Sequence, residues 1–246
     1  MNFFRFIEER QSYYQEIKEA ADEAYCYQTL SAKIEPTIVK KQYGIGGKVM
    51  LRGPLCPCFL EDYVVGNVHR GRLCAIAKKP DYTYYFDDWG RLVKVDKHTE
   101  VGICSEYIIS KGNISYGFHF SGQERWKDGV YAVILEDGHI GATVYHPVIG
   151  DYSHSVLDDV WTFEYADGRP IFVAQCYVKE LPDLIHSEFS GPCRGYRLEF
   201  DEKDQIVRYY TSNLLYPERD ELRQERSFDL ARPIPPKVWQ QTYGLI

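Results

Sequence analysis

The residues best suited to bind a metal are two closely spaced cysteines and three histidines. Cys56 and Cys58 are separated by a single proline, whereas the specific zinc signature is a Cys-x-x-Cys motif matched by a second one, which this chain lacks. The histidines at positions 139, 146 and 154 do not have the helical spacing that makes a metal motif specific. The sequence therefore predicts neither a metal nor another cofactor. The alternative is that neighbouring strands bring these side chains together.

Paired carboxylates and one thiol are the remaining candidates for catalysis. Asp87-Asp88 and Asp158-Asp159 are pairs of adjacent residues, and adjacent residues on a strand point to opposite faces, so neither pair can flank one bond. We interpret the first pair as part of a turn and the second as the beginning of a strand. Cys193 precedes an arginine that could stabilise a thiolate, but no motif with a histidine partner surrounds it. No catalytic residue is predicted, and the sequence favours a non-catalytic protein.

Residues 43–48 (YGIGGK) have the glycines and the lysine of a phosphate-binding loop. A Walker loop places four residues between its first glycine and the Gly-Lys pair, and a Ser or Thr follows the lysine. Here Val49 follows Lys48. We therefore predict a turn that leads into an apolar run.

Aromatic side chains are the strongest candidates for a binding surface, because the chain has 21 Tyr, 12 Phe and 4 Trp. Exposed Tyr and Trp anchor protein partners and can stack on the flat faces of sugars. The binding residues that we select are Trp89, Trp126, Trp161 and Tyr165. For each of them the alternative is an ordinary place in the hydrophobic core.

Charge and hydropathy limit the possible partners and the compartment. Lys and Arg total 29 against 36 Asp and Glu, which gives a net charge of −7. Such a chain repels nucleic acid and anionic lipid surfaces and suits a basic protein partner. The N-terminus becomes charged before an apolar run reaches the length of a signal-peptide core, and no run approaches the ~18 apolar residues of a membrane span. We expect a cytoplasmic protein.

The seven cysteines are expected to be reduced. An odd number argues against a disulfide framework. Cys26, Cys74, Cys104 and Cys176 lie in apolar or aromatic stretches, where a thiol packs as a small hydrophobic group.

We expect a single domain over residues 1–246 that is mainly β, an antiparallel meander of hairpins forming a curved sheet, a barrel or a sandwich. Residues 2–31 have apolar side chains at helical spacing, which predicts an N-terminal helix that ends before Pro36. Residues 37–215 are short Val, Ile, Tyr, Phe and Thr runs broken by Gly, Asp and Asn, which is typical of strands and turns. Residues 216–246 predict a short solvated helix and a proline-rich tail whose apolar end packs back on the core.

Five segments share one pattern, in which two short alternating apolar runs flank an Asp-rich turn. They are residues 84–95, 118–126, 133–142, 163–172 and 198–209. Asp137-Gly138 and Asp167-Gly168 are the strongest turn signals, because Asp-Gly tolerates the positive φ angles of tight hairpins. The segments therefore predict consecutive antiparallel hairpins rather than β-α-β units.

The first and last of these segments resemble the YD-repeat hairpins of Rhs-type proteins. That pattern is aromatic, any residue, aromatic, Asp, two residues, Gly, Arg, Leu, and the matching residues are Tyr84, Phe86, Asp87, Gly90, Arg91 and Leu92. The last segment has Asp204 and Gln205 in place of the Gly and the Arg. In that family the repeats form long arrays, for which five imperfect copies are too few. The resemblance implies hairpins and no particular function.

Two functional hypotheses follow from the sequence. The first is a non-catalytic cytoplasmic protein that binds another protein, such as an immunity-like protein that neutralises a toxin. The second is a small-ligand or carbohydrate-binding protein, or a hydrolase, with a pocket in a β-barrel or sandwich. A deep interior cavity with converging polar side chains would favour the second hypothesis, and a filled interior would favour the first.

Overall fold

The computed structural model describes residues 16–17, 19, 25–50, 52, 59–60, 71–121, 126–148, 158–178, 193–213 and 225–239. These residues form thirteen strands and a few short helices. The strands are β1 (Lys40–Ile45), β2 (Arg72–Cys74), β3 (Tyr82–Phe86), β4 (Leu92–Thr99), β5 (Gly102–Lys111), β6 (Ile114–Ser121), β7 (Trp126–Glu136), β8 (His139–Pro147), β9 (Asp158–Ala166), β10 (Arg169–Val178), β11 (Cys193–Phe200), β12 (Ile206–Asn213) and β13 (Arg226–Ile234). The helices whose bounds fall within the described residues are α3 (Tyr27–Ile34), the 3-10 turn η2 (Glu35–Thr37) and α4 (Pro236–Trp239).

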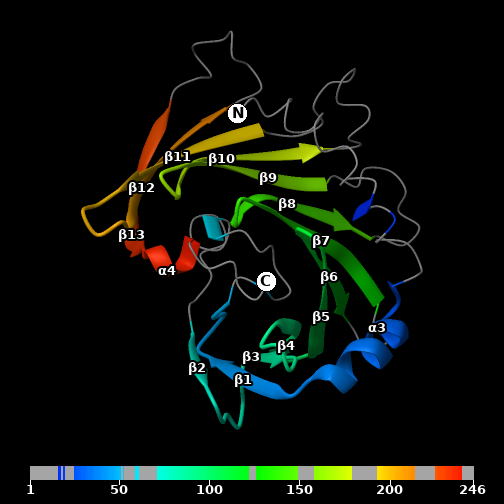
Figure 1. The fold of residues 1–246 in the computed structure, drawn as a ribbon. Coiled ribbons are helices and arrows are strands. Elements are labelled where there is room, and N and C mark those ends of the chain that lie inside the picture. Colours follow the sequence, from blue (N-terminus) through cyan, green and yellow to red (C-terminus); the bar gives the residue numbers. More distant parts are fainter. Residues whose placement is uncertain are drawn as a thin grey trace.

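All the described strands belong to one antiparallel sheet. Its order is β13-β12-β11-β10-β9-β8-β7-β6-β5-β4-β3-β1-β2, so every neighbour from β3 to β13 is also a neighbour in the sequence. The sheet bends strongly and stays open between β13 and β2 (Figure 1). The prediction of a mainly β, antiparallel meander is confirmed, and its form is the curved sheet rather than a barrel or a sandwich.

The two Asp-Gly turns have the backbone that the sequence predicts. Asp137 and Gly138 have φ angles of 47° and 80°, and Asp167 and Gly168 have 51° and 74°. Positive φ at both central residues defines the type I′ turn, whose twist matches that of the flanking strands. These turns join β7 to β8 and β9 to β10.

The other three predicted hairpins also form. β3 pairs with β4, β6 with β7 and β11 with β12, and Gly90 and Asp204 supply positive φ angles of 75° and 58° at two of the turns. The turn between β6 and β7 lies outside the described residues. Two further hairpins, β4–β5 and β5–β6, were not among the predicted segments; Gly112, with a φ of 60°, lies in the turn of the second one.

The helical N-terminal region differs from the continuous helix predicted over residues 2–31. Cys26 has an extended backbone, with φ −79° and ψ 163°, and α3 begins after it. The helix then continues beyond residue 31 to Ile34 and ends before Pro36, as predicted. Residues 16, 17 and 19 are helical, and residues 2–15 lie outside the described part of the chain.

The two faces of the sheet are covered by different segments. In Figure 1, α3 lies outside the curve, against an outer core that includes Leu30, Tyr107 and Phe118. Phe59 and Trp239 of α4 belong to an inner core on the opposite face. β7 shows the consequence of this arrangement, because Val130, Ala132 and Ile134 face the outer core while Tyr131 and Val133 face the inner one.

The C-terminal region is only partly as predicted. The short solvated helix expected after Pro217 falls mainly on residues outside the described part. The proline-containing stretch that follows forms β13, which includes Pro233, an imino acid that sheets tolerate on edge strands. Val238 and Trp239 are buried in the inner core, as expected for the start of the apolar tail, and residues 240–246 lie outside the described part of the chain.

The prediction that Cys176 is a reduced thiol is wrong. Cys176 is buried in the outer core as expected, but it is disulfide-bonded. The residue directly opposite it on the neighbouring strand is Cys193. Cys26, Cys74 and Cys104 are free thiols. None of the described helices is long and apolar enough to cross a membrane.

A buried ion pair holds the inner face of β5 and β6 together. The Arg52 guanidinium lies 3.1 Å from a Glu106 carboxylate oxygen, and the two side chains are 2% and 1% exposed. The same guanidinium donates hydrogen bonds to the hydroxyl and the carbonyl of Ser115. A Cβ atom on Gly117 would lie 2.0 Å from the Glu106 carboxylate, so only glycine leaves room for this pair.

We expect Glu106→Leu to lower the free energy of unfolding by about 3 kcal/mol, because it removes the carboxylate that faces the buried Arg52 guanidinium. The double variant Arg52→Met, Glu106→Leu should lose less than the sum of the Arg52→Met and Glu106→Leu single variants, since both charges of the pair are removed together. Denaturant unfolding of wild type, the two single variants and the double variant gives the double-mutant cycle. Additive losses would mean that the pair contributes no coupling.

Candidate functional site

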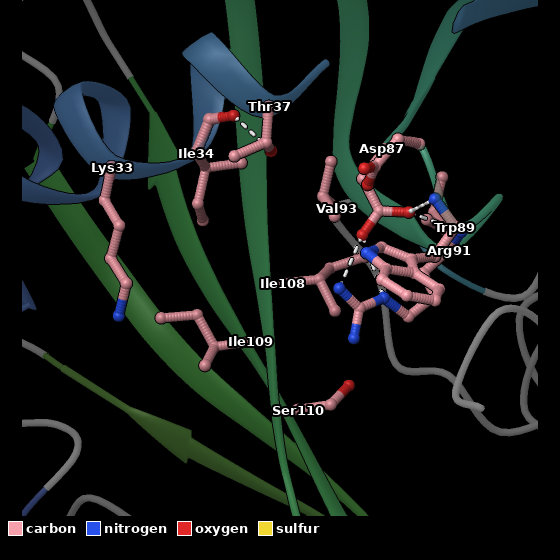
Figure 2. A pocket seen from close by; sticks show the side chains of 12 residues that line it. Lys33, Ile34, Thr37, Asp87, Trp89, Arg91, Val93, Ile108, Ile109 and Ser110 are labelled. Carbon is pink, nitrogen blue, oxygen red and sulfur yellow. Dashed lines mark hydrogen bonds and ion pairs between the residues drawn. The ribbon is translucent and has the colours of Figure 1, made fainter. Parts of the chain in front are cut away.

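A pocket with a volume of about 380 Å³ lies where the end of the α3–η2 segment meets the β3–β4 turn (Figure 2). We call it the Trp89 pocket. Its apolar residues are Ile34, Leu92, Val93, Ile108 and Ile109, and its other residues are Lys33, Thr37, Asp87, Asp88, Trp89, Arg91 and Ser110. Figure 2 shows Trp89, Asp87 and Arg91 on one side, and Lys33 and Ile109 on the other.

The pocket exists because two neighbouring strands stop pairing before they end. The β4–β5 register runs from Thr99 opposite Gly102 to Lys94 opposite Tyr107. Beyond this point β4 turns back toward the β3–β4 turn, while β5 continues to Lys111. β5 remains paired with β6 here, and the apolar side chains beside the separation, which belong to the core or pack against it, also line the pocket.

Asp87 fixes the conformation of the turn that carries Trp89. One of its carboxylate oxygens accepts hydrogen bonds from the backbone N–H groups of Trp89 and Arg91, at 3.0 and 2.8 Å. The other accepts from the Arg91 guanidinium, at 2.8 and 2.7 Å. Asp87 is buried, whereas Trp89 is 79% exposed. The indole is therefore held at the surface by a turn with its own internal ion pair. The prediction that Asp87-Asp88 is part of a turn is confirmed.

Glu35 fixes the opposite wall of the pocket. Its carboxylate accepts hydrogen bonds from the Lys94 ammonium at 2.9 Å and from the Tyr107 hydroxyl at 2.7 Å. Burial alone would raise the pKa of Glu35, but these two hydrogen bonds, the charge of Lys94 and a hydrogen bond with Ser31 together outweigh it, and the pKa lies below its usual value. The contacts attach the end of α3 to the outer face of the sheet and thereby place Lys33 and Ile34 beside the pocket.

The polar side chains of the pocket differ in what they already bind. The Asp87 and Arg91 charges neutralise one another. The ammonium of Lys33 and the carboxylate of Asp88 are exposed and form no ion pair or hydrogen bond within the described residues. The site thus offers an indole face, an aliphatic floor and two free opposite charges, which suits binding rather than proton transfer.

The structure places the other predicted binding residues elsewhere. Trp161 is fully buried in the inner core, where it stacks on Tyr196 with ring centroids 5.9 Å apart. Tyr165 is half-buried, stacks on His139 and donates its hydroxyl to the carbonyl of Ile140. Trp126 begins β7, and its side chain lies outside what the structure describes. Of the described candidates, Trp89 alone has a largely exposed side chain.

A second polar cluster lies on the inner face around Asp159, which the sequence analysis placed at the start of a strand. β9 does begin at Asp158. The Asp159 carboxylate accepts hydrogen bonds from the indole N–H of Trp161 and the amide of Gln175. Burial raises the pKa of Asp159 to about 6, although both hydrogen bonds act in the opposite direction. The cluster is 8% exposed at Asp159, so it is part of the core.

His119 forms a third polar group, on β6. Its Nδ1 lies 3.3 Å from an Asp128 carboxylate oxygen, and the hydroxyl of Ser121 donates to the other oxygen of Asp128. Burial lowers the pKa of His119, Asp128 opposes this effect and Lys97 adds to it. The buried Nε2 has no hydrogen-bond partner among the described residues. No nucleophile is shown within reach of it, so we assign it no catalytic role.

The remaining chemical candidates do not assemble into a site. His139 and His146 lie at opposite ends of β8, and His154 falls outside the described residues. No group of three or more His, Cys, Asp or Glu side chains among the described residues could hold a metal ion. The N–H groups of Gly46 and Gly47 in the glycine-rich turn donate hydrogen bonds to the carboxylate of Asp81, which directly precedes β3, at 2.6 and 3.1 Å. Cys56 and Cys58 lie outside the described residues.

Sequence reasoning did not find the other residues of the Trp89 pocket. Lys33 and Ile34 lie just after the predicted helix (residues 2–31), and Ile109 and Ser110 lie within the predicted strand region (residues 37–215). The one available signal was Pro36, which marks the end of the helix and thus the point where the chain reaches the sheet. Nothing in the sequence shows that β5 extends beyond its pairing with β4.

Comparisons with known proteins give no relative: no family model matches the chain, and neither a curated protein nor a solved structure does. The resemblance to YD-repeat hairpins therefore has no further support.

We expect Asp87→Ala to lower the free energy of unfolding by about 1 to 3 kcal/mol, because it removes a buried acceptor of turn N–H groups and the partner of Arg91. The matched control is Asp88→Ala, which should leave stability unchanged within about 0.5 kcal/mol, since Asp88 is exposed and unpaired. Denaturant unfolding measures both. Equal effects of the two substitutions would contradict the role given to Asp87.

Asp159 should make stability depend on pH. Its pKa is about 6 in the folded protein against 3.8 for a free side chain, so the folded state holds the proton more tightly. The free energy of unfolding should therefore fall as the pH rises from about 4 to about 6, by up to about 3 kcal/mol. Asp159→Asn removes this titration. The difference in the free energy of unfolding between the variant and the wild type should therefore change between about pH 4 and about pH 6. A constant difference would show that Asp159 titrates normally.

Proposed function

We propose that this chain is a non-catalytic protein that binds another protein, and that Trp89 anchors the partner. The observation that carries the proposal is a 79% exposed indole, held in a turn with its own ion pair, beside an aliphatic pocket. Trp residues near a pocket dominate the energy of many protein interfaces. A turn that is already rigid also loses little conformational entropy when it binds.

The neighbourhood of Trp89 adds apolar surface. Val39, which is exposed, donates its backbone N–H to the carbonyl of Phe86 and thus lies beside the strand that leads into the Trp89 turn. Two exposed apolar side chains and an open aliphatic pocket therefore lie near the same end of the sheet. Clustered apolar surface is more informative than scattered single residues, which are normal on any protein.

The state of the inner face supports binding over catalysis. Phe59, Leu60 and the α4 residues Val238 and Trp239 are buried against it. The polar groups described there, around Asp159 and Arg52, bind one another rather than line an open cavity. Among the described residues, these contacts give no support to the second hypothesis, a ligand or substrate held inside the curve of the sheet.

The net charge of −7 suggests a basic partner. Opposite net charges speed up the encounter of two proteins, and added salt weakens this attraction. A narrower form of the proposal is that the protein acts in the cytoplasm and neutralises a toxin as an immunity-like protein. This form depends on the partner, and its test is functional: cells that express the partner alone should stop growing, and co-expression of this chain should restore growth.

The test compares capture by wild type, Trp89→Ala and Val101→Ala from a native lysate at low salt. Val101 is the matched control, because it is 90% exposed and lies in the turn at the opposite end of β4. A partner should be retained in stoichiometric amount by wild type and Val101→Ala, and about tenfold less by Trp89→Ala. The partner is then purified, and it must bind purified wild-type protein in the absence of the lysate.

Two results would overturn the proposal. One is that no protein is retained stoichiometrically by wild type at low salt. The other is that a purified partner binds Trp89→Ala as tightly as wild type, which would place the interface elsewhere. Unfolding curves of the three proteins should coincide, because both substituted side chains are exposed.

A further inference from the structure

We infer that the Trp89 pocket receives the side chain of an arginine or lysine from the partner, with its aliphatic stem on the floor and its charged head at the Trp89–Asp88 rim. This inference rests on the proposed function and names the chemistry of the inserted group. It is carried by the distribution of apolar surface and of paired and unpaired charges around one pocket.

The floor suits a long aliphatic chain. Ile34 and Ile109 lie on the α3 side of the pocket, and Ile108 lies between them and Arg91 (Figure 2). Arginine and lysine carry three or four methylene groups that pack on apolar surface while the charged head stays near water. A pocket of about 380 Å³ is large enough for such a side chain.

The rim at the turn suits a cation. Trp89 presents an exposed indole, and the neighbouring Asp88 carboxylate is unpaired within the described residues. A guanidinium or ammonium over an indole gains a cation–π interaction, and a carboxylate beside it adds an ion pair. The Arg91 charge opposes this only weakly, because its guanidinium is already paired with Asp87 at 2.7 Å.

Lys33 determines which way the occupant lies. Its unpaired ammonium is on the opposite side of the pocket from Trp89 (Figure 2). A cationic head is therefore repelled from the α3 side and attracted to the turn side. The position of Lys33 also distinguishes a cationic occupant from an anionic one. Loss of the Lys33 charge should strengthen the binding of a cationic group and weaken the binding of an anionic one.

The first experiment uses small probes with the full chain. Nα-acetyl-arginine methylamide is titrated into ¹⁵N-labelled protein, and the indole N–H signal of Trp89, assigned with Trp89→Phe, reports binding. The controls are the citrulline analogue, which has the same shape without the charge, and Nα-acetyl-glutamate methylamide. The arginine probe should bind at least about threefold more tightly than the citrulline probe. Equal affinities would overturn the inference.

The second experiment uses variants that keep the fold. Asp88→Asn should weaken the arginine probe about two- to fivefold, and Lys33→Gln should strengthen it by a similar factor. Val101→Ala should leave it unchanged. The opposite result would be that Lys33→Gln binds the glutamate probe more weakly than wild type does, and that wild type binds the glutamate probe more tightly than the arginine probe. This result would show that the pocket takes an anion instead.

The failure of this inference can be told apart from failure of the proposed function. If a protein partner depends on Trp89 but the arginine probe binds no better than its neutral analogue, the partner inserts an uncharged side chain and only this inference is wrong. If the arginine probe binds at Trp89 but no protein is captured, the proposed function is wrong and the pocket takes a free cationic ligand.

Discussion

The constraint on which the structure depends is that one long antiparallel sheet has two faces, and each must be shielded from water. Alternate residues of a strand point to opposite faces, so β7 needs cover on both sides for Val130–Ile134. On the outer side these residues share a core with Leu30 and Ile34 of α3, and on the inner side they share one with Phe59, Leu60 and α4. The curvature of the sheet lets short segments cover much of the inner face. The polar groups that remain there, Arg52 and Asp159 among them, are held by hydrogen bonds within the core.

The hairpins could be predicted because their signals are local. Asp137-Gly138 and Asp167-Gly168 need positive φ angles, and the short apolar runs around them can form only strands. β13 was harder to predict, because it is a largely exposed edge strand that carries charges and Pro233. The interruption of the helix at Cys26 has no local marker, since the apolar spacing continues across it. The disulfide of Cys176 depends on which strands become neighbours, and the sequence does not contain that information in readable form.

The candidate site was predicted only in part, because the sequence shows local turns but not which distant segments meet. Trp89 lies in a turn whose Asp and Gly residues can be recognised, so its place in a turn was predictable, while the sequence left open whether its side chain is exposed. Trp161 lies in a strand of alternating pattern, but the pattern does not tell which face is covered, and the structure buries it completely. The partners of Trp89 in the pocket come from α3 and β5, far from it in the sequence. They meet only because the β4–β5 ladder ends early, which is a property of the whole sheet.

The strand order also bears on how the chain reaches its native state. From β3 to β13 every strand pairs with its neighbour in the sequence, and only β1 departs from this rule by pairing with β3 as well as with β2. Short separations between paired segments mean small losses of loop-closure entropy, and low contact order accompanies rapid folding. Each new hairpin can therefore be added to an existing edge, so that assembly proceeds by stepwise growth rather than by a single distant encounter of the two ends.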